Sequence, residues 1–169
     1  APACVSGQST NFKAVASDSL GNTCAAGTVV FPDSSDTVDL GNGVTVKRPY
    51  ADDCPVVAMF YADGKAKWAK TLAAKPVGST YPKCEFLSVA MDNLGNVYVA
   101  GIVNLNYQYD FGNDVKISGV YAKGSSARNA VIVKYNSLGQ AQWAKAAEAA
   151  SDQSEFWTVA VDTTGNVYA

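Results

Sequence analysis

The sequence predicts an all-β fold made of repeated units, and three observations lead to this fold class. An eight-residue pattern occurs three times, as VASDSLGN at 15–22, VAMDNLGN at 89–96 and VAVDTTGN at 159–166. The segments around it are rich in Val, Tyr and Phe, which favour strands. Only AKAAEAAS at 144–151 has a helical composition, and it is short and lies where a strand should end. Self-similarity at a period of about 70 residues is typical of repeat architectures.

Size and composition fit one globular domain rather than a disordered or membrane-spanning chain. The 169 residues are 48% hydrophobic and 17% charged, with a formal net charge of −2. No basic patch stands out, which excludes nucleic acid as an expected partner. The longest apolar stretch, 97–103, is too short for a transmembrane segment.

The repeat extends beyond the eight-residue pattern and divides the chain. The second block of each unit, VVAMFYADGKAKWAK at 56–70 and VIVKYNSLGQAQWAK at 131–145, also matches. We align Tyr61 with Tyr135 and Trp68 with Trp143, so this hairpin loop is expected to be one residue shorter in one copy. The expected divisions are an N-terminal segment 1–11, a first unit 12–85, a second unit 86–155 and the start of a third unit at 156–169.

Each copy of the pattern contains Asp-x-x-Gly-Asn, which predicts a hairpin turn. The aspartate accepts backbone N–H groups of the turn, and the glycine supplies the positive φ that reverses the chain. The expected turn-capping residues are Asp18, Gly21, Asp92, Gly95, Asp162 and Gly165. Carboxylates that are repeated around an axis could bind calcium. However, calcium takes six to eight oxygen ligands, and each turn offers one carboxylate. Turn capping is therefore the favoured interpretation, with no metal expected.

The strands are apolar on both faces, which indicates that sheets cover them on both sides. Each unit offers four main strands, and segments 38–47 and 109–118 form an insertion between the second and third. Small antiparallel four-stranded sheets that stack face to face around an axis are the blades of a β-propeller. The sequence thus predicts propeller blades.

The segments VAVDTTGNVYA, YDFGND and VIVKYNSLGQAQWAK resemble the bacterial β-propeller repeats called SBBP repeats. The resemblance covers about 12–71, 86–146 and 156–169. It implies a propeller of several blades that is exported to the periplasm or cell surface, and it implies no particular reaction. Because two and a fraction blades cannot close a ring, we expect either a fragment of a longer protein, which we favour, or a ring or stack that several chains complete.

The four cysteines, Cys4, Cys24, Cys54 and Cys84, form no CxxC pair, and the chain contains no histidine, which argues against zinc. An even count favours two disulfides in an exported protein, and the start APAC resembles the first residues after a leader cleavage site. The alternative is four buried free thiols in a cytosolic protein. Among the three pairings, we favour Cys4 with Cys24 and Cys54 with Cys84, because near-neighbour bridges fit consecutive segments of a blade.

Aromatic residues give the candidate binding sites. We expect Trp68 and Trp143 to pack between blades. Five tyrosines fall in loops outside the shared strand core, where binding residues concentrate. These candidates for binding loops, for which local packing is the alternative, are Tyr50, Tyr81, Tyr107, Tyr109 and Tyr121.

No catalytic constellation is visible in the sequence. Histidine is absent as a general base, and a GxSxG nucleophile elbow and a glycine-rich phosphate loop are both missing. We therefore expect a non-enzymatic, exported bacterial cell-surface protein that serves as a binding or structural module for a protein or a glycan. The alternatives are a subunit of a surface assembly or filament completed between chains, and a fragment of a propeller hydrolase or lyase.

Overall fold

The computed structural model describes residues 9–31, 36–50, 53–77, 83–104, 107–118, 128–147 and 153–169. Within these ranges the protein contains strands and turns and no helix, and all paired strands run antiparallel. The all-β prediction is confirmed for this part of the chain.

Each full unit forms one four-stranded sheet, as the repeat predicted. The first sheet has the order β1-β2-β5-β6, and the second has the order β7-β8-β11-β12. The strands of the first sheet are β1 (Ser9–Ser17), β2 (Thr23–Val30), β5 (Cys54–Phe60) and β6 (Ala66–Lys70). Those of the second are β7 (Cys84–Met91), β8 (Val97–Asn104), β11 (Arg128–Tyr135) and β12 (Ala141–Ala146).

Three small hairpins complete the described fold. Two are the predicted insertions between the second and third strands of each sheet, and one begins the third unit. They consist of β3 (Thr37–Asp39) with β4 (Thr45–Lys47), β9 (Gln108–Asp110) with β10 (Lys116–Ser118), and β13 (Ala160–Val161) with β14 (Val167–Tyr168).

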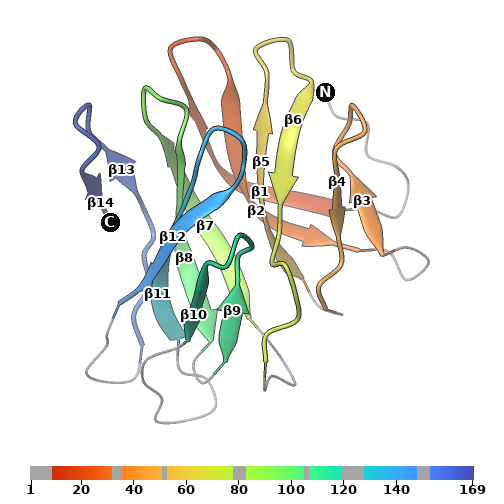
Figure 1. Cartoon of the computed structure of the whole chain (residues 1–169), viewed down its shortest axis with the longest axis vertical. Helices are drawn as coiled ribbons and strands as arrows, with labels where there is room; N and C mark the ends of the chain where they lie inside the picture. The colour runs from red at the N-terminus through yellow and green to blue at the C-terminus, as the bar shows by residue number, and fades with distance from the viewer. Residues whose placement is uncertain are drawn as a thin grey trace.

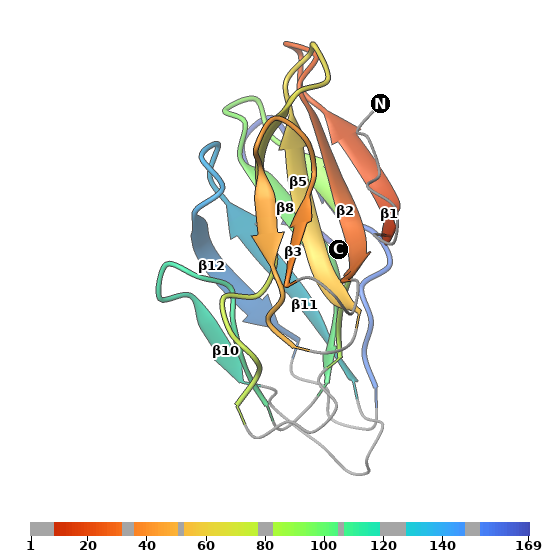
Figure 2. The same cartoon turned by 90° about the vertical axis from the view of Figure 1, so that its right-hand side faces the viewer.

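The two large sheets pack against each other through β7, which lies against β1, β2 and β5. Figure 1 shows the hairpin turns of both sheets gathered at the upper end of the molecule. Figure 2 shows the hairpin β3–β4 in front of β2 and β5. The described strands form separate sheets and no closed barrel or ring.

Strands β2, β5 and β8 are buried along almost their whole length, as their apolar sequences predicted. One face of the first sheet is covered by the second sheet, and residues of the hairpin β3–β4 such as Val38 and Val46 belong to the same core. Burial on both faces explains why these strands show no alternation of apolar and polar residues.

A β-bulge occurs at the same place in both units. In β1 the register shifts between Phe12 and Ala14, next to Gly27 of β2. In β7 it shifts between Phe86 and Ser88, next to Gly101 of β8. A Cβ atom on Gly27 would overlap the carbonyl oxygen of Asn11, and one on Gly101 would overlap that of Glu85. Both glycines are therefore required by a close backbone approach.

The second hairpins have equal turns, so the expected difference of one residue was wrong. The Tyr61 N–H donates to the Lys65 carbonyl at 2.9 Å, and the Asn136 N–H donates to the Gln140 carbonyl at 2.9 Å. Tyr61 thus corresponds to Asn136, and Tyr135 corresponds to Phe60. Both copies carry the same bulge just before the turn, which keeps Trp68 and Trp143 equivalent.

The predicted disulfides were also wrong for the described cysteines. Cys24, Cys54 and Cys84 are reduced and fully buried, and Cys4 lies outside the described residues. Cys24 pairs in register with Met59, whereas Cys54 pairs with Val29 at the other end of the sheet. All three thiols belong to the hydrophobic core, where cysteine behaves as a small apolar residue. The even cysteine count therefore does not support export.

We expect these thiols to react only after unfolding. Burial raises the pKa of the Cys54 thiol to about 12, and burial raises that of Cys84 well above its ordinary value. Since the thiolate is the reactive species, a thiol reagent should label the native protein very slowly at neutral pH. In denaturant without reductant, at least three thiols should titrate. Fewer than three would show that a described cysteine is oxidised.

Candidate functional site

The aspartates of the repeated pattern are engaged by their own turns. The Asp18 carboxylate accepts the backbone N–H groups of Leu20 and Asn22, both at 2.9 Å, and the Asn22 side-chain amide at 2.7 Å. Asp92 and Asp162 accept the equivalent three hydrogen bonds. Gly21, Gly95 and Gly165 have φ values of 81°, 76° and 88°, which the turn requires.

A tyrosine adds a further donor in the second and third units. The Tyr98 hydroxyl donates to Asp92 Oδ2 at 3.0 Å, and the Tyr168 hydroxyl donates to Asp162 Oδ2 at 3.1 Å. Both carboxylate oxygens of each aspartate are thus occupied. Across the described ranges, no group of three or more histidine, cysteine, aspartate or glutamate side chains lies close enough to hold a metal ion.

Replacing Asp92 with alanine should destabilise the protein by about 2 kcal/mol, since hydrogen bonds to a charged group are stronger than neutral ones. Burial raises the pKa of the Asp92 carboxyl, but hydrogen bonds from Asn96, Tyr98 and Leu94 outweigh it, and the net pKa is lowered. A lowered folded-state pKa gives stability that is complete above the carboxyl's ordinary pKa and is lost as the pH falls through the folded value. The gap in unfolding free energy between wild type and Asp92→Ala should stay constant from pH 7 to 5 and narrow below about pH 4.

Urea denaturation at each pH measures this gap. Asp63→Ala is the matched control, because Asp63 accepts a backbone N–H within the turn between β5 and β6 from an exposed position beside Lys65. If the difference in unfolding free energy between wild type and Asp92→Ala widened at acid pH, the stabilising role of the ionised Asp92 carboxylate would be contradicted.

The loop tyrosines that the structure describes are packed into the protein. Tyr109 is fully buried, and its hydroxyl donates to the Lys83 carbonyl at 3.0 Å and accepts the Asn104 N–H at 3.1 Å. Tyr50 is buried, with its hydroxyl 3.3 Å from the Asp53 carbonyl, and Tyr107 is partly buried against the core. Their burial favours local packing over ligand binding. Tyr81 and Tyr121 lie outside the described residues.

Trp68 joins the two units. Its indole N–H donates to the Ser137 carbonyl at 3.1 Å, and its ring centroid lies 6.2 Å from that of Tyr135. A Cβ atom at Gly139 would lie 2.7 Å from the Trp68 ring, so the tryptophan presses directly on the turn of the next unit. Trp68 is only 7% exposed. The junction therefore consists of a tryptophan from one sheet and a glycine turn from the following sheet.

The equivalent face of the second sheet is partly open. Trp143 lies 6.2 Å from Tyr98, and the Lys134 ammonium lies 5.1 Å above the Tyr98 ring. Trp143, Lys134 and Ile132 are each only partly buried. We call these residues, together with Tyr98, the Trp143 face.

The first sheet shows what covers such a face. Trp68, Met59 and Val57, which correspond to Trp143, Lys134 and Ile132, are all buried by the second sheet. Sequence reasoning singled out Trp143 but missed Ile132 and Lys134. The sequence did contain a signal for this more exposed face, since Lys134 replaces the core residue Met59 at this position of the repeat.

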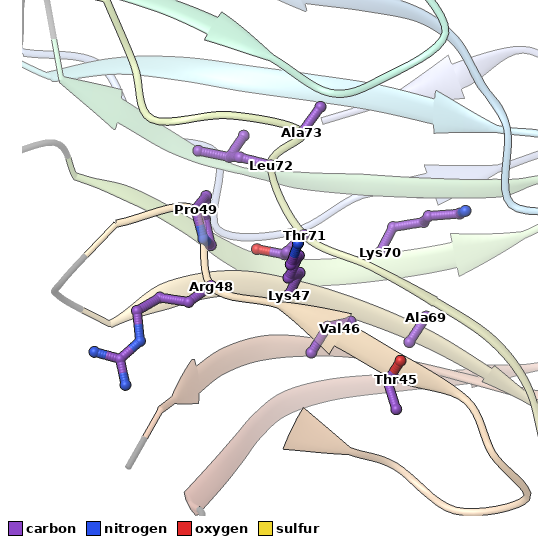
Figure 3. A pocket seen from close by; sticks show the side chains of 10 residues that line it. All are labelled: Thr45, Val46, Lys47, Arg48, Pro49, Ala69, Lys70, Thr71, Leu72 and Ala73. Atoms are coloured by element: carbon purple, nitrogen blue, oxygen red, sulfur yellow. The ribbon is translucent and has the colours of Figure 1, made fainter. Parts of the chain in front are cut away.

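A shallow hollow of about 240 Å³ between β4 and the end of β6 contains several basic residues. Lys47, Arg48 and Lys70 line it, and none of the described residues that line it is acidic. However, Figure 3 shows Arg48 and Lys70 pointing in opposite directions. The Arg48 guanidinium stacks over Phe31 at 5.5 Å and lies 3.5 Å from Asp36. The cations do not converge, so the hollow is a weaker candidate than the Trp143 face.

No protein-family model matches the chain, and a search of curated proteins finds no significant match. None of the described residues form a helix long and apolar enough to traverse a bilayer.

Proposed function

We propose that the chain is a non-enzymatic structural and binding module of an exported bacterial repeat protein, whose sheets are β-propeller blades and whose partner is another protein. The observation that carries this proposal is the contrast between two equivalent tryptophans. Trp68 is covered by the following sheet, whereas Trp143 presents the same kind of surface and is only partly covered.

The succession of first strands supports the blade arrangement. Strand β7 lies against β1, and β13 lies against β7, so the same strand of each unit meets its counterpart in the unit before. A repeated contact of this kind is what sheets stacked around a common axis produce. Export and a cell-surface location are proposed from the resemblance of the repeats alone.

A protein partner fits the Trp143 face better than a glycan does. The face combines an indole, a branched aliphatic side chain and a lysine over a tyrosine ring, which matches the surface that a packed sheet covers in the first unit. Tryptophan and tyrosine are also the residues that dominate protein interfaces.

Sedimentation velocity tests the proposal. As the concentration is raised into the high micromolar range, wild type should associate, and Trp143→Ala should associate much less. Val77→Ser, which alters an exposed apolar residue before β7, should associate like wild type. A wild-type chain that stays monomeric while it binds polysaccharides in a glycan screen would instead favour the glycan-binding alternative.

A further inference from the structure

A hollow of about 280 Å³ lies between the two large sheets, at the end of the molecule where the hairpin turns gather (Figure 1). The first sheet lines it with the turn between β1 and β2 and with residues of β5 and β6, and the second sheet lines it with the turns after β7 and β11. We call it the Asp18 hollow. None of the described residues that line it belongs to the Trp143 face, so a ligand here would be separate from the protein partner proposed above.

The second and third units show what occupies the equivalent position. The Tyr98 hydroxyl donates to Asp92 Oδ2 at 3.0 Å, and the Tyr98 ring lies 5.1 Å from the Lys134 ammonium. In the third unit, the Tyr168 hydroxyl donates to Asp162 Oδ2 in the same way. A tyrosine ring therefore extends along the strand that follows the turn, until its hydroxyl meets the turn aspartate.

The first unit has a cysteine where these tyrosines stand. Cys24 lies opposite Met59, in the same register as Tyr98 opposite Lys134. Asp18 and Met59 correspond to the two residues that contact the Tyr98 ring, and both of them line the hollow. The Asp18 hollow thus corresponds to the space that a tyrosine ring fills in the second unit.

One oxygen of Asp18 keeps an open acceptor position. Within the described residues, Asp18 Oδ2 accepts a hydrogen bond from the Asn22 side-chain amide alone, at 2.7 Å. The corresponding oxygen of Asp92 accepts two hydrogen bonds, from Asn96 at 2.8 Å and from Tyr98 at 3.0 Å. Because a carboxylate oxygen has two lone pairs, Asp18 Oδ2 can accept the hydroxyl that a cysteine does not supply.

The charges at the hollow select a neutral donor. Burial raises the pKa of the Asp18 carboxyl, but the hydrogen bonds of its turn and the positive charge of Lys67 outweigh it, and the net pKa is lowered. At neutral pH the Asp18 carboxylate therefore only accepts hydrogen bonds, and a ligand must donate to it. Lys67 lines the same hollow, and its ammonium repels a second cation. A hydroxyl group fits these conditions better than an amine.

The apolar walls fit an aromatic ring. Met59 lies on the inner side of the hollow, at 1% exposure, and Leu20 and Leu94 line it from two different turns. Methionine packs favourably against aromatic rings. We propose that the Asp18 hollow binds a phenol, whose hydroxyl donates to Asp18 Oδ2 and whose ring packs against these three side chains. The phenol is either a free small molecule or the tyrosine side chain of a partner.

The probe is p-cresol, and p-methylanisole is its control, because methylation keeps the ring and removes the hydroxyl donor. Each compound is titrated into the isotope-labelled full chain while the backbone amide resonances are recorded by NMR. The resonances of Leu20, Asn22 and Gly95 should shift saturably with p-cresol. The anisole should bind about tenfold more weakly, as expected when a hydrogen bond to a charged group is lost. Equal affinity for the two compounds, or no saturable shift at these residues, would overturn the site.

Replacing Asp18 with asparagine tests the acceptor. The amide keeps the size of the side chain and removes its charge, so Asp18→Asn should weaken p-cresol binding about tenfold. Asp162→Asn is the matched control, because Asp162 caps the same turn in the third unit and does not line the hollow. This control should bind p-cresol like wild type, and circular dichroism confirms that both variants are folded. Equal affinities of the two variants would contradict a contact with Asp18.

Cys24→Tyr supplies the missing ring from the chain itself. The variant should keep the urea denaturation midpoint of wild type and should no longer bind p-cresol, because the new ring fills the hollow. Cys54→Tyr is the control for overpacking, since Cys54 is equally buried at the other end of the sheet, and it should lower the midpoint. An equal fall of the midpoint in both variants would show that no ring fits beside Asp18 and would overturn the site.

A third probe identifies the source of the phenol. N-acetyltyrosinamide carries the same ring on a peptide backbone. If it binds at least as tightly as p-cresol and shifts the same resonances, the tyrosine side chain of a partner is the ligand. If p-cresol alone binds, the ligand is a free small phenol. Both results support the hydroxyl contact with Asp18, and failure of both compounds to bind would overturn it.

Discussion

Replacing Gly101 with alanine is expected to destabilise the protein by about 3 kcal/mol or more, at the upper end of the cost of forcing extra atoms into a packed core. The new methyl group would overlap the backbone carbonyl of Glu85 at the β7 bulge. Backbone cannot move aside as a flexible side chain can, so β7 and β8 would have to separate. Such a loss is a large part of the stability of an ordinary domain.

Urea denaturation followed by circular dichroism measures the effect. Gly27→Ala should behave in the same way, because the equivalent bulge in β1 brings the Asn11 carbonyl onto that position. Gly112→Ala is the matched control: its φ is 88°, but no atom lies near its Cβ position, so it should cost only about 1–2 kcal/mol. A Gly101→Ala variant as stable as Gly112→Ala would contradict the close approach.

Replacing Trp68 with alanine is expected to cost about 3–5 kcal/mol, the usual range for a buried aromatic residue. The substitution removes the hydrogen bond to Ser137 and the packing on Tyr135 and Gly139, so it breaks the junction between the units. Trp143→Ala removes the same side chain from the equivalent position of the second sheet. It should cost clearly less, because Trp143 is only partly buried.

The two tryptophan variants are compared by their denaturation midpoints under the same conditions. The comparison controls for the residue type, the strand and the position in the repeat. Equal losses would mean that the second sheet is covered as completely as the first, and that the Trp143 face is not available to a partner.

Much of the fold could be predicted because the same strand and turn residues recur in each repeat. The Asp-x-x-Gly-Asn pattern contains the residues that build the turn, so the turn and its two strands follow from local chemistry. The alignment of Tyr61 with Tyr135 failed because it matched two identical residues instead of keeping the spacing that relates Trp68 to Trp143. That spacing relates Phe60 to Tyr135 and Tyr61 to Asn136, in agreement with the turn hydrogen bonds.

The cysteines and the loop tyrosines were harder to interpret for a different reason. A buried reduced cysteine and a disulfide-bonded one look the same in sequence, and only the packing separates them. For Tyr109 a signal did exist. The insertion segments align Tyr109 with Val38, and both side chains are buried in the core, at 0% and 1% exposure. The repeat thus indicates an inward side chain where the loop position alone suggested a binding residue.

The contact between Trp68 and Gly139 has a consequence for how the protein unfolds. Strand β6, the last strand of the first sheet, contacts the turn between β11 and β12 of the second sheet. If either of these segments detaches, the other sheet therefore loses stabilising contacts. Neighbour contacts of this kind make adjacent repeats melt together. We expect a single cooperative unfolding transition for the two sheets. In a row of such units the contact would also be directional, because the last strand of each unit would be stabilised by the unit that follows it.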